Sequence, residues 1–226
     1  MSSTVRRVLV TGANRGFGAT IVKVFDRAGW DVVGVSREVV GRERGRWVHW
    51  DVTDDDVSPL TGSLGDEPLD LLINNAGTGT PGTPLDGVVV STLLDVCDVN
   101  VGGVIRATRA VLPNLRRTKQ PIVINVSSRL GSIHDQAAGR YRGFGTSYAY
   151  RIAKAAQNMA TTCLAEELAP DVRVWAVHPG RLATGMGRAD AATDPAVAAQ
   201  RLLDLVRGPE KRSPLFLDLE NGELPW

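Results

Sequence analysis

Short apolar runs alternate with helical patterns along most of this 226-residue chain, and this alternation restricts its fold more than any other feature. Runs of this kind, rich in valine, isoleucine and leucine, are typical of strands that are buried on both faces. Seven of them occur, at residues 8–10, 32–35, 47–50, 69–73, 122–126, 172–177 and 215–217. Alternating strands and helices favour a parallel sheet, so we predict an α/β fold with one doubly wound parallel sheet and helices on both faces.

Helical spacing of apolar residues predicts where the helices lie and which stripe each one buries. The first helix carries apolar residues from Ile21 to Ala28 and ends at Gly29, and the last covers residues 195–206. The predicted stripe of a helix at 98–117 consists of Val101, Val104, Ile105, Thr108, Val111 and Leu112, and that of a helix at 147–168 of Ile152, Ala155, Ala156, Met159 and Leu164.

Composition and charge exclude several classes of protein. Hydrophobic residues make up 43% and charged residues 23%, as in a globular chain rather than a disordered one. Lysine plus arginine (26) nearly balance aspartate plus glutamate (25), so the net charge of +1 gives no field that would gather nucleic acid or an anionic membrane. The N-terminus lacks the apolar region of a signal peptide, and no run approaches the roughly 20 apolar residues that span a bilayer.

Cysteine and histidine usage points to a cytoplasmic protein without a metal. Cys97 and Cys163 each lie in an apolar stretch, which predicts buried, reduced thiols. His134 and His178 have no partner at metal-ligand spacing, so we expect no metal site. Because the chain has no linker or repeat, residues 1–226 are expected to form one domain.

The first strand ends in the glycine-rich turn TGANRGFG at residues 11–18. Gly12 permits a sharp turn, Gly16 allows the backbone to approach a phosphate, and Gly18 lets the following helix pack closely on the sheet. The free N–H groups of that helix then favour an anion. Three glycines in a turn also occur without a nucleotide, so the strand before and the helix after support the prediction of a dinucleotide site.

The spacing TGxxxGxG, in place of GxGxxG, resembles the short-chain dehydrogenase/reductase superfamily. Later motifs appear in the order of that family: NNAG at 74–77, Asn100 in DVNVGG, Ser127 with Ser128, Tyr150 with Lys154 in YxxxK, and Pro179-Gly180. The stretches SSRLGSI, SYAYRIAKAAQNM and FLDLENGELPW look like the C-factor and sniffer-type carbonyl reductase branch. The resemblance, over residues 8 to about 184, implies a Rossmann-type fold and an oxidoreductase.

The resemblance also implies a nicotinamide cofactor and the residues that bind it. NAD-specific members carry an acid at the end of the second strand, where this chain has Ser36 followed by Arg37. Arg37 and Arg15 can offer guanidinium groups to a 2′-phosphate, so we expect NADP(H). Two alternatives stay open: Glu38 facing the ribose would reverse the preference, and Arg37 can instead be a solvated cation at the strand end.

The full set of cofactor-binding residues that the family pattern implies is larger. Asp51 with Val52 resembles the adenine contact, although Asp51 can instead cap the next helix, and Thr184 would bond the nicotinamide carboxamide or a phosphate. The set comprises Gly12, Asn14, Arg15, Gly16, Phe17, Gly18, Ser36, Arg37, Asp51, Val52, Asn75, Ala76, Gly77, Tyr150, Lys154, Pro179, Gly180, Leu182 and Thr184.

Tyr150 and Lys154 are four apart in a helical segment, so both side chains lie on one face. This spacing also occurs on ordinary solvent-facing helices, and the position after the strand that ends in Ser127-Ser128 favours a catalytic role. An ammonium about 4 Å away, at an effective dielectric constant of 20, would favour a phenolate by roughly 4 kcal/mol. We therefore expect Lys154, with the positively charged nicotinamide ring of NADP⁺ nearby, to lower the pKa of Tyr150 toward neutrality, where an acid or base works best.

The family mechanism assigns four catalytic residues. Tyr150 would protonate a carbonyl oxygen that receives a hydride at carbon, Ser128 would position that oxygen, and Lys154 would bind the nicotinamide ribose. Asn100 would hold a water that passes protons to Lys154, or else be a helix-interior amide bonded to the backbone. Ser127 is expected to support the structure.

The function expected from the resemblance is reversible, NADPH-dependent reduction of a ketone or aldehyde to an alcohol. The alternative is a non-catalytic NADP(H)-binding regulatory or signalling protein. Segments 78–84, 129–147 and 181–194 would bound the small-molecule site, with Ile133, His134, Tyr141 and Phe144 as lining residues or as plain surface. A homodimer or homotetramer through the helices after Asp98 and Ser147 is expected, with a monomer as the alternative.

Overall fold

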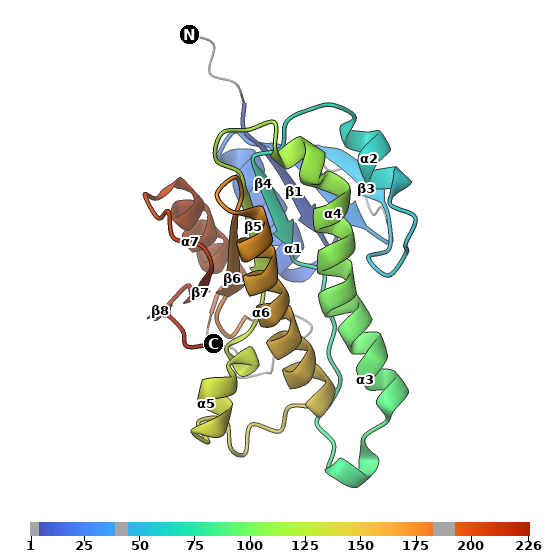
Figure 1. The fold of residues 1–226 in the computed structure, drawn as a ribbon, viewed down its shortest axis with the longest axis vertical. Helices are drawn as coiled ribbons and strands as arrows, with labels where there is room; N and C mark the ends of the chain where they lie inside the picture. Colours follow the sequence, from blue (N-terminus) through green and yellow to red (C-terminus); the bar gives the residue numbers. More distant parts are fainter. Residues whose placement is uncertain (1–4, 39–44, 183–192) are drawn as a thin grey trace.

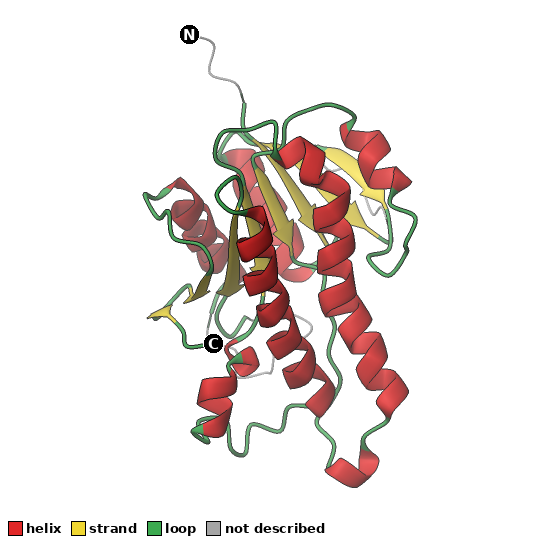
Figure 2. Cartoon of the chain, viewed as in Figure 1, coloured by secondary structure: helices red, strands yellow, loops and turns green. Residues whose placement is uncertain are grey.

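The computed structural model describes residues 5–38, 45–182 and 193–226, and its centre is one 8-stranded sheet in the order β3-β2-β1-β4-β5-β6-β7-β8 (Figures 1 and 2). The strands from β1 to β7 are parallel, and β8 runs antiparallel to β7. Their bounds are β1 Arg7–Thr11, β2 Asp31–Ser36, β3 Arg46–His49, β4 Leu71–Asn74, β5 Ile122–Val126, β6 Arg173–His178, β7 Leu215–Asp218 and β8 Gly222–Glu223. The predicted doubly wound sheet is confirmed, and β8 is a strand that the apolar runs did not predict.

Helices cover both faces of the sheet, as the view in Figure 1 shows. The helices are α1 Gly16–Arg27, α2 Ser58–Leu64, α3 Val90–Cys97, α4 Gly103–Leu115, α5 Ile133–Ala137, α6 Tyr148–Leu168 and α7 Pro195–Arg207, with short helical turns η1 Leu85–Gly87, η2 Asp98–Gly102 and η3 Arg129–Gly131. Strand alternation divides the core: Val8 and Val10 of β1 pack with α1 and α7, whereas Leu9 packs with α2, α4 and α6.

The buried stripe predicted for the helix at 147–168 is wrong. Ile152 and Met159 of α6 are 43% and 61% exposed. The face that α6 buries consists of Ala149, Ala153, Lys154, Gln157, Asn158, Thr161, Ala165 and Leu168. Half of these side chains are polar, so hydrogen-bond partners on neighbouring elements, rather than apolar periodicity, decide which face is inside.

Two further expectations differ in detail. The helix predicted at 98–117 begins earlier, because α3, η2 and α4 follow one another from Val90 to Leu115, and Ile105 of its predicted stripe is 40% exposed. Cys163 was expected to be buried but is exposed on α6, whereas Cys97 is half-buried, and both are free thiols.

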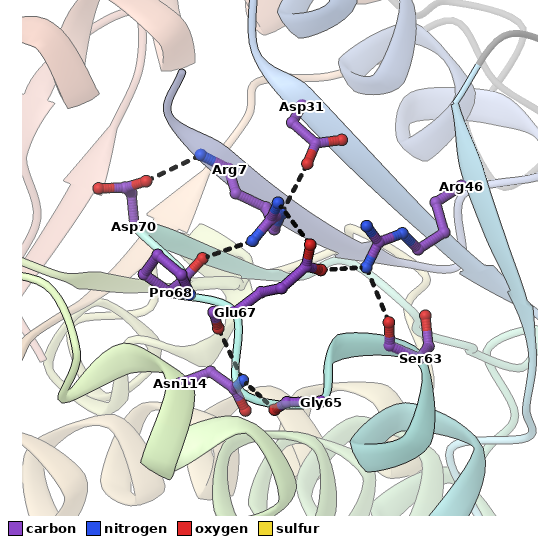
Figure 3. A network of polar contacts seen from close by, with 9 residues as sticks. All are labelled: Arg7, Asp31, Arg46, Ser63, Gly65, Glu67, Pro68, Asp70 and Asn114. Atoms are coloured by element: carbon purple, nitrogen blue, oxygen red, sulfur yellow. Dashed lines mark hydrogen bonds and ion pairs between the residues drawn. The ribbon is translucent and has the colours of Figure 1, made fainter. Parts of the chain in front are cut away.

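The amino ends of the parallel strands are joined by a polar network, drawn in Figure 3. Arg7, the first residue of β1, donates from Nε to Asp31 at 2.6 Å and pairs with Glu67 at 3.3 Å. Arg46, the first residue of β3, donates to Glu67 at 2.5 Å. This network lies at the edge of the sheet opposite to the carboxyl ends of the strands, where parallel sheets bind ligands.

Within residues 5–38, 45–182 and 193–226, no helix combines the length and apolar character needed to cross a membrane. Over those same ranges, no group of three or more His, Cys, Asp or Glu side chains is arranged to hold a metal ion.

Candidate active site

The glycine turn after β1 is tightly joined to the turn after β4. Gly12 has a φ of 63° and Gly16 a φ of 55°, conformations that favour glycine. A β-carbon on Gly18 would stand 2.1 Å from the carbonyl oxygen of Gly12, so only glycine fits there. Asn75 donates from Nδ2 to the carbonyl oxygens of Thr11 and Gly12 at 3.0 and 3.1 Å. The NNAG motif therefore fixes the shape of the turn from the neighbouring strand.

Helix α1 begins directly at this turn with Gly16, and its first turn has neither a side-chain cap nor an acidic residue. Its N–H groups are thus available to an anion, and the dipole of a 12-residue helix points at the same place. Arg15 is exposed at the N-cap, Asn14 is half-buried, and Phe17 is buried in the core. This arrangement can hold a phosphate group.

The end of β2 places Ser36 and Arg37 beside the end of β3. Ser36 is buried and its hydroxyl donates to the carbonyl oxygen of Glu38 at 2.6 Å. The Arg37 side chain is 70% exposed and lies 3.9 Å from the carboxylate of Asp51. Thr53 donates to Asp51 Oδ1 from its amide and its hydroxyl, at 3.0 and 2.8 Å.

Asp51 does not cap the next helix, because α2 begins at Ser58 after Val57. Val52 is buried against α4, where a β-carbon on Gly103 would stand 2.8 Å from the β-carbon of Val52. Of the alternatives for Asp51, helix capping is therefore excluded.

Lys154 is buried on α6, where its ammonium is held by two neutral oxygens. Nζ donates to the carbonyl oxygen of Val126 at 2.8 Å and to Oε1 of Gln157 at 2.9 Å. It lies 5.8 Å from the centre of the Tyr150 ring. Burial lowers the pKa of Lys154 to about 7, because the charged form loses its hydration.

The pKa of the Tyr150 phenol is raised in the protein alone, whereas the sequence predicts a lowered pKa with both Lys154 and NADP⁺ nearby. Burial raises the pKa of the phenol, and its hydrogen bond with Ser128 acts in the opposite direction but is the smaller effect. Ser128 lies two residues after β5, at the N-cap of η3, and its hydroxyl accepts from the amide of Leu130 at 3.2 Å. Ser127 donates to Oδ1 of Asn158 on α6 at 2.6 Å, a supporting contact.

Asn100 lies in η2, a π-helical turn between α3 and α4, and is fully buried. Its amide nitrogen donates to the carbonyl oxygens of Thr78 and Val96 at 2.9 and 2.8 Å, which is the backbone-bonded alternative. Its Oδ1 has no hydrogen-bond partner among the described residues. A β-carbon on Gly77 would stand 3.0 Å from Asn100 Oδ1 and 3.7 Å from Lys154 Nζ, so this oxygen is a free acceptor close to the ammonium.

Segments 78–84 and 129–147 meet at Tyr150. A β-carbon on Gly79 would stand 2.9 Å from Cδ2 of the Tyr150 ring. Pro81 and Thr146 form an isolated antiparallel bridge, and a β-carbon on Gly82 would stand 2.2 Å from the carbonyl oxygen of Gly145. The two segments therefore pack against each other beside the phenol.

The lining residues expected in segment 129–147 point in different directions. Tyr141 is buried and donates to Asp135 at 2.9 Å, and burial raises its pKa to about 12. Phe144 packs edge-on against Tyr141 at 5.7 Å. Ile133 is 65% exposed on α5, and His134 is also exposed.

After β6, Pro179 and Gly180 are buried, and Gly180 has a φ of 96°. Leu182 pairs with Thr193 in an isolated bridge. His178, at the end of β6, is buried, and its Nδ1 has no partner in the ranges that the structure describes; burial lowers its pKa to about 4. Thr184 and most of segment 181–194 lie outside the described residues.

A family model described as short chain dehydrogenase matches residues 6–195. This chain belongs to the short-chain dehydrogenase/reductase family. C-signal of Myxococcus xanthus is 35% identical over 162 residues, which cover 70% of this chain and 93% of C-signal.

Two solved structures resemble this short-chain dehydrogenase over 98% of its length. One is the NADPH-bound carbonyl reductase from chicken fatty liver, with 26% identity, a TM-score of 0.87 and 99% of that chain covered. The other is the carbonyl reductase Sniffer of D. melanogaster, with 26% identity, a TM-score of 0.83 and 100% of that chain covered. The predicted family and its carbonyl reductase relatives are confirmed.

Several polar residues that lie behind Lys154 were not identified from the sequence. Asn74 donates to Asn125, and Asn125 donates to Thr161, both at 2.9 Å. Thr161 in turn donates to the main-chain oxygen of Gln157 at 2.9 Å. A signal was available, because polar residues at 157, 158 and 161 share the helical face of Lys154, and Asn125 interrupts an apolar strand.

Proposed function

We propose that this short-chain dehydrogenase reduces a ketone or aldehyde to an alcohol with NADPH, reversibly. The observation that carries the proposal is the set of Tyr150, hydrogen-bonded to Ser128, and the buried ammonium of Lys154, at the carboxyl edge of the sheet beside the glycine turn. The likeness to an NADPH-bound carbonyl reductase over 98% of the chain supports it.

The residues around the turn fit a dinucleotide. The uncapped start of α1 and the glycine backbone at positions 12, 16 and 18 would hold the pyrophosphate. Asn75, Ala76 and Gly77 would line its path toward Lys154. When bound, the nicotinamide ring supplies or accepts the hydride at the carbonyl carbon.

NADP(H) rather than NAD(H) is favoured by the residues at the end of β2. Ser36 stands where a carboxylate would repel a 2′-phosphate, and the exposed guanidinium groups of Arg37 and Arg15 are available as partners. Arg37 is only 3.9 Å from Asp51, so binding the phosphate would require it to exchange this exposed ion pair, which costs little.

The proton transfer follows from Tyr150. Its O–H bond breaks as a new O–H bond forms on the carbonyl oxygen, while Ser128 donates a hydrogen bond to the same oxygen. The ammonium of Lys154 stabilises the phenolate that remains. Asn100, with its free Oδ1, would hold a water through which Lys154 recovers a proton.

The proposal extends to the surroundings of the site. Residues 1–226 would form one domain, with segments 78–84, 129–147 and 181–194 bounding a small-molecule pocket. Exposed Leu94, Ile105 and Ile152 on α3, α4 and α6 support self-association as a dimer or tetramer. The free thiols of Cys97 and Cys163 fit a reducing compartment such as the cytoplasm.

Replacement of Tyr150 by phenylalanine tests the proposal. Tyr150→Phe removes the proton donor and should slow carbonyl-dependent NADPH oxidation by roughly 10²- to 10⁴-fold. The dissociation constant for NADPH, measured by tryptophan fluorescence, should change little. Tyr148→Phe is the matched control, since Tyr148 is 46% exposed two residues earlier on α6, and it should keep full activity.

The outcomes separate the enzyme from the regulatory alternative. Unchanged turnover in Tyr150→Phe would refute the role of the phenol. NADPH binding by the wild-type protein, with no turnover of any aldehyde or ketone in a broad panel, would instead favour a non-catalytic NADP(H)-binding protein.

A further inference from the structure

Gln157 is a fully buried amide one helical turn after Lys154, on the face of α6 that points inward. Its Oε1 accepts from Lys154 Nζ at 2.9 Å, and its Nε2 has no hydrogen-bond partner within the part of the chain that the structure describes. We infer that Gln157 is a positioning residue for the reaction: its side-chain oxygen fixes the ammonium of Lys154 and keeps it charged. This inference rests on the proposed function.

The chemistry of the ammonium explains why such an oxygen matters. A lysine has three N–H donors, and at Lys154 two of them are taken by Val126 O and Gln157 Oε1. One donor is left for the phenol, the ribose or a water. Burial disfavours the charged form, whereas hydrogen bonds to neutral oxygens favour it. Gln157 therefore opposes the loss of the positive charge on which the phenolate depends.

Packing alone does not account for a glutamine at position 157, because among the described residues nothing pairs with its Nε2. A buried N–H group without a partner destabilises the folded state, so a sulfur-containing side chain of the same length would serve the core at least as well. What distinguishes glutamine at this position is the contact of its oxygen with Lys154. The main chain at Gln157 is held separately, by Thr161 at 2.9 Å.

Few charged groups compete for Lys154. On α6 itself, the titratable or charged neighbours of Lys154 are Tyr150 and Arg151. The elements packed against this helix add Asp95 and Cys97 from α3, Asp98 from η2, Arg129 from η3, and Arg173 and His178 from β6. His178 interacts electrostatically with Lys154. Among residues 5–38, 45–182 and 193–226, no carboxylate forms an ion pair with Lys154, so Gln157 supplies its side-chain acceptor.

The test titrates Lys154 directly in the protein without ligands. The chain has four lysines, Lys23, Lys119, Lys154 and Lys211, so ¹³Cε-labelled lysine gives few NMR signals, and Lys154→Met assigns the one that matters. Gln157→Met removes the acceptor at nearly constant volume, and Gln157→Glu replaces it with a carboxylate. Thr161→Val is the control, because it removes a buried hydroxyl from the same face without touching Lys154.

We expect the pKa of Lys154 to shift in opposite directions in Gln157→Met and Gln157→Glu. Gln157→Met should weaken proton binding by Lys154 by about tenfold, and Gln157→Glu should strengthen it by at least as much. Thr161→Val should leave it unchanged. Since a lower pKa means that the ammonium is lost at lower pH, the alkaline limb of kcat/KM for carbonyl reduction should move down in Gln157→Met and up in Gln157→Glu.

Two results would overturn the inference. One is a pKa of Lys154 that is the same in the wild type and in both Gln157 variants, and the other is a pKa that shifts in the same direction in both variants. If Gln157→Met fails to fold, the rise expected in Gln157→Glu still decides the question. The titration needs no substrate, so an expected pair of NMR shifts in a protein that reduces no carbonyl would uphold the contact and refute the proposed function alone.

Discussion

At the scale of single residues, the dinucleotide turn depends on a missing side chain. Gly18 sits inside α1 with the carbonyl oxygen of Gly12 only 2.1 Å from where its β-carbon would be, and Asn75 Nδ2 at 2.5 Å. Both neighbours are fixed, one as backbone and the other by two hydrogen bonds to that backbone. Any side chain must therefore push α1 away from the sheet edge.

Gly18→Ala should destabilise the fold by about 1–3 kcal/mol through this overlap and weaken NADPH binding by at least about tenfold. Gly62→Ala is the matched control, because Gly62 is also helical but has open space around its β-carbon position. There the substitution should stabilise by about 0.4–1 kcal/mol. Urea unfolding and NADPH titration measure both effects, and equal behaviour of the two variants would contradict the close approach.

At the scale of elements, the first turn of α6 both carries the phenol and holds the neighbouring segment. Arg151 donates to Thr146 Oγ1 at 2.6 Å, to Gln136 Oε1 at 2.5 Å and to the carbonyl oxygen of Tyr141 at 3.3 Å. One guanidinium thus ties α6 to three points of segment 129–147. The same segment contacts 78–84 through Pro81 and Thr146, so its position sets the space beside Tyr150.

Arg151→Ala should loosen segment 129–147 while the sheet stays intact. We expect faster amide hydrogen exchange confined to this segment, and a KM for the carbonyl substrate raised several-fold with NADPH binding little changed. Arg109→Ala, at an exposed position on α4, should do neither. If segment 129–147 exchanges its amide hydrogens at the same rates in Arg151→Ala as in the wild type, Arg151 does not order this segment.

At the scale of the whole molecule, the two ends of the parallel strands have different tasks. The carboxyl ends carry the turn, Ser128 and the approach to Tyr150, whereas the amino ends are joined by the ion-pair network of Figure 3. Glu67 is central there, since it pairs with both Arg7 and Arg46. The hydrogen bond from Arg46, more than the charge of Arg7, holds the pKa of Glu67 below its ordinary value.

A lowered pKa in the folded state gives Glu67 a definite pH signature. Its contribution to stability is complete above the ordinary glutamate pKa of about 4.3 and is lost as the pH falls through the lower folded value. The melting temperature of Glu67→Gln should therefore lie below that of the wild type near neutrality, with the gap closing in acid. Glu166→Gln, at an exposed site on α6, should show no such trend. A gap that stays constant down to pH 2 would contradict the ion pair.

The sequence by itself determined the seven parallel strands, the glycine turn and the order of the motifs. Each of these depends on local properties: β-branched runs such as 122–126 must be buried on both faces, and a turn with Gly12, Gly16 and Gly18 has few conformations open to it. Seven strands therefore lie within two residues of their predicted positions.

Only the tertiary structure decided which face of α6 is buried and what surrounds Lys154. Apolar spacing favoured Ile152 and Met159, yet the helix turns Lys154 and Thr161 inward, because their partners Val126 and Asn125 come from β5, far away in the chain. The upward direction of the Tyr150 pKa arises in the same way, since burial is created by segments that meet only after folding. Periodicity reports which side chains share a face, but a buried polar group is stable only where distant parts of the chain supply its hydrogen bonds.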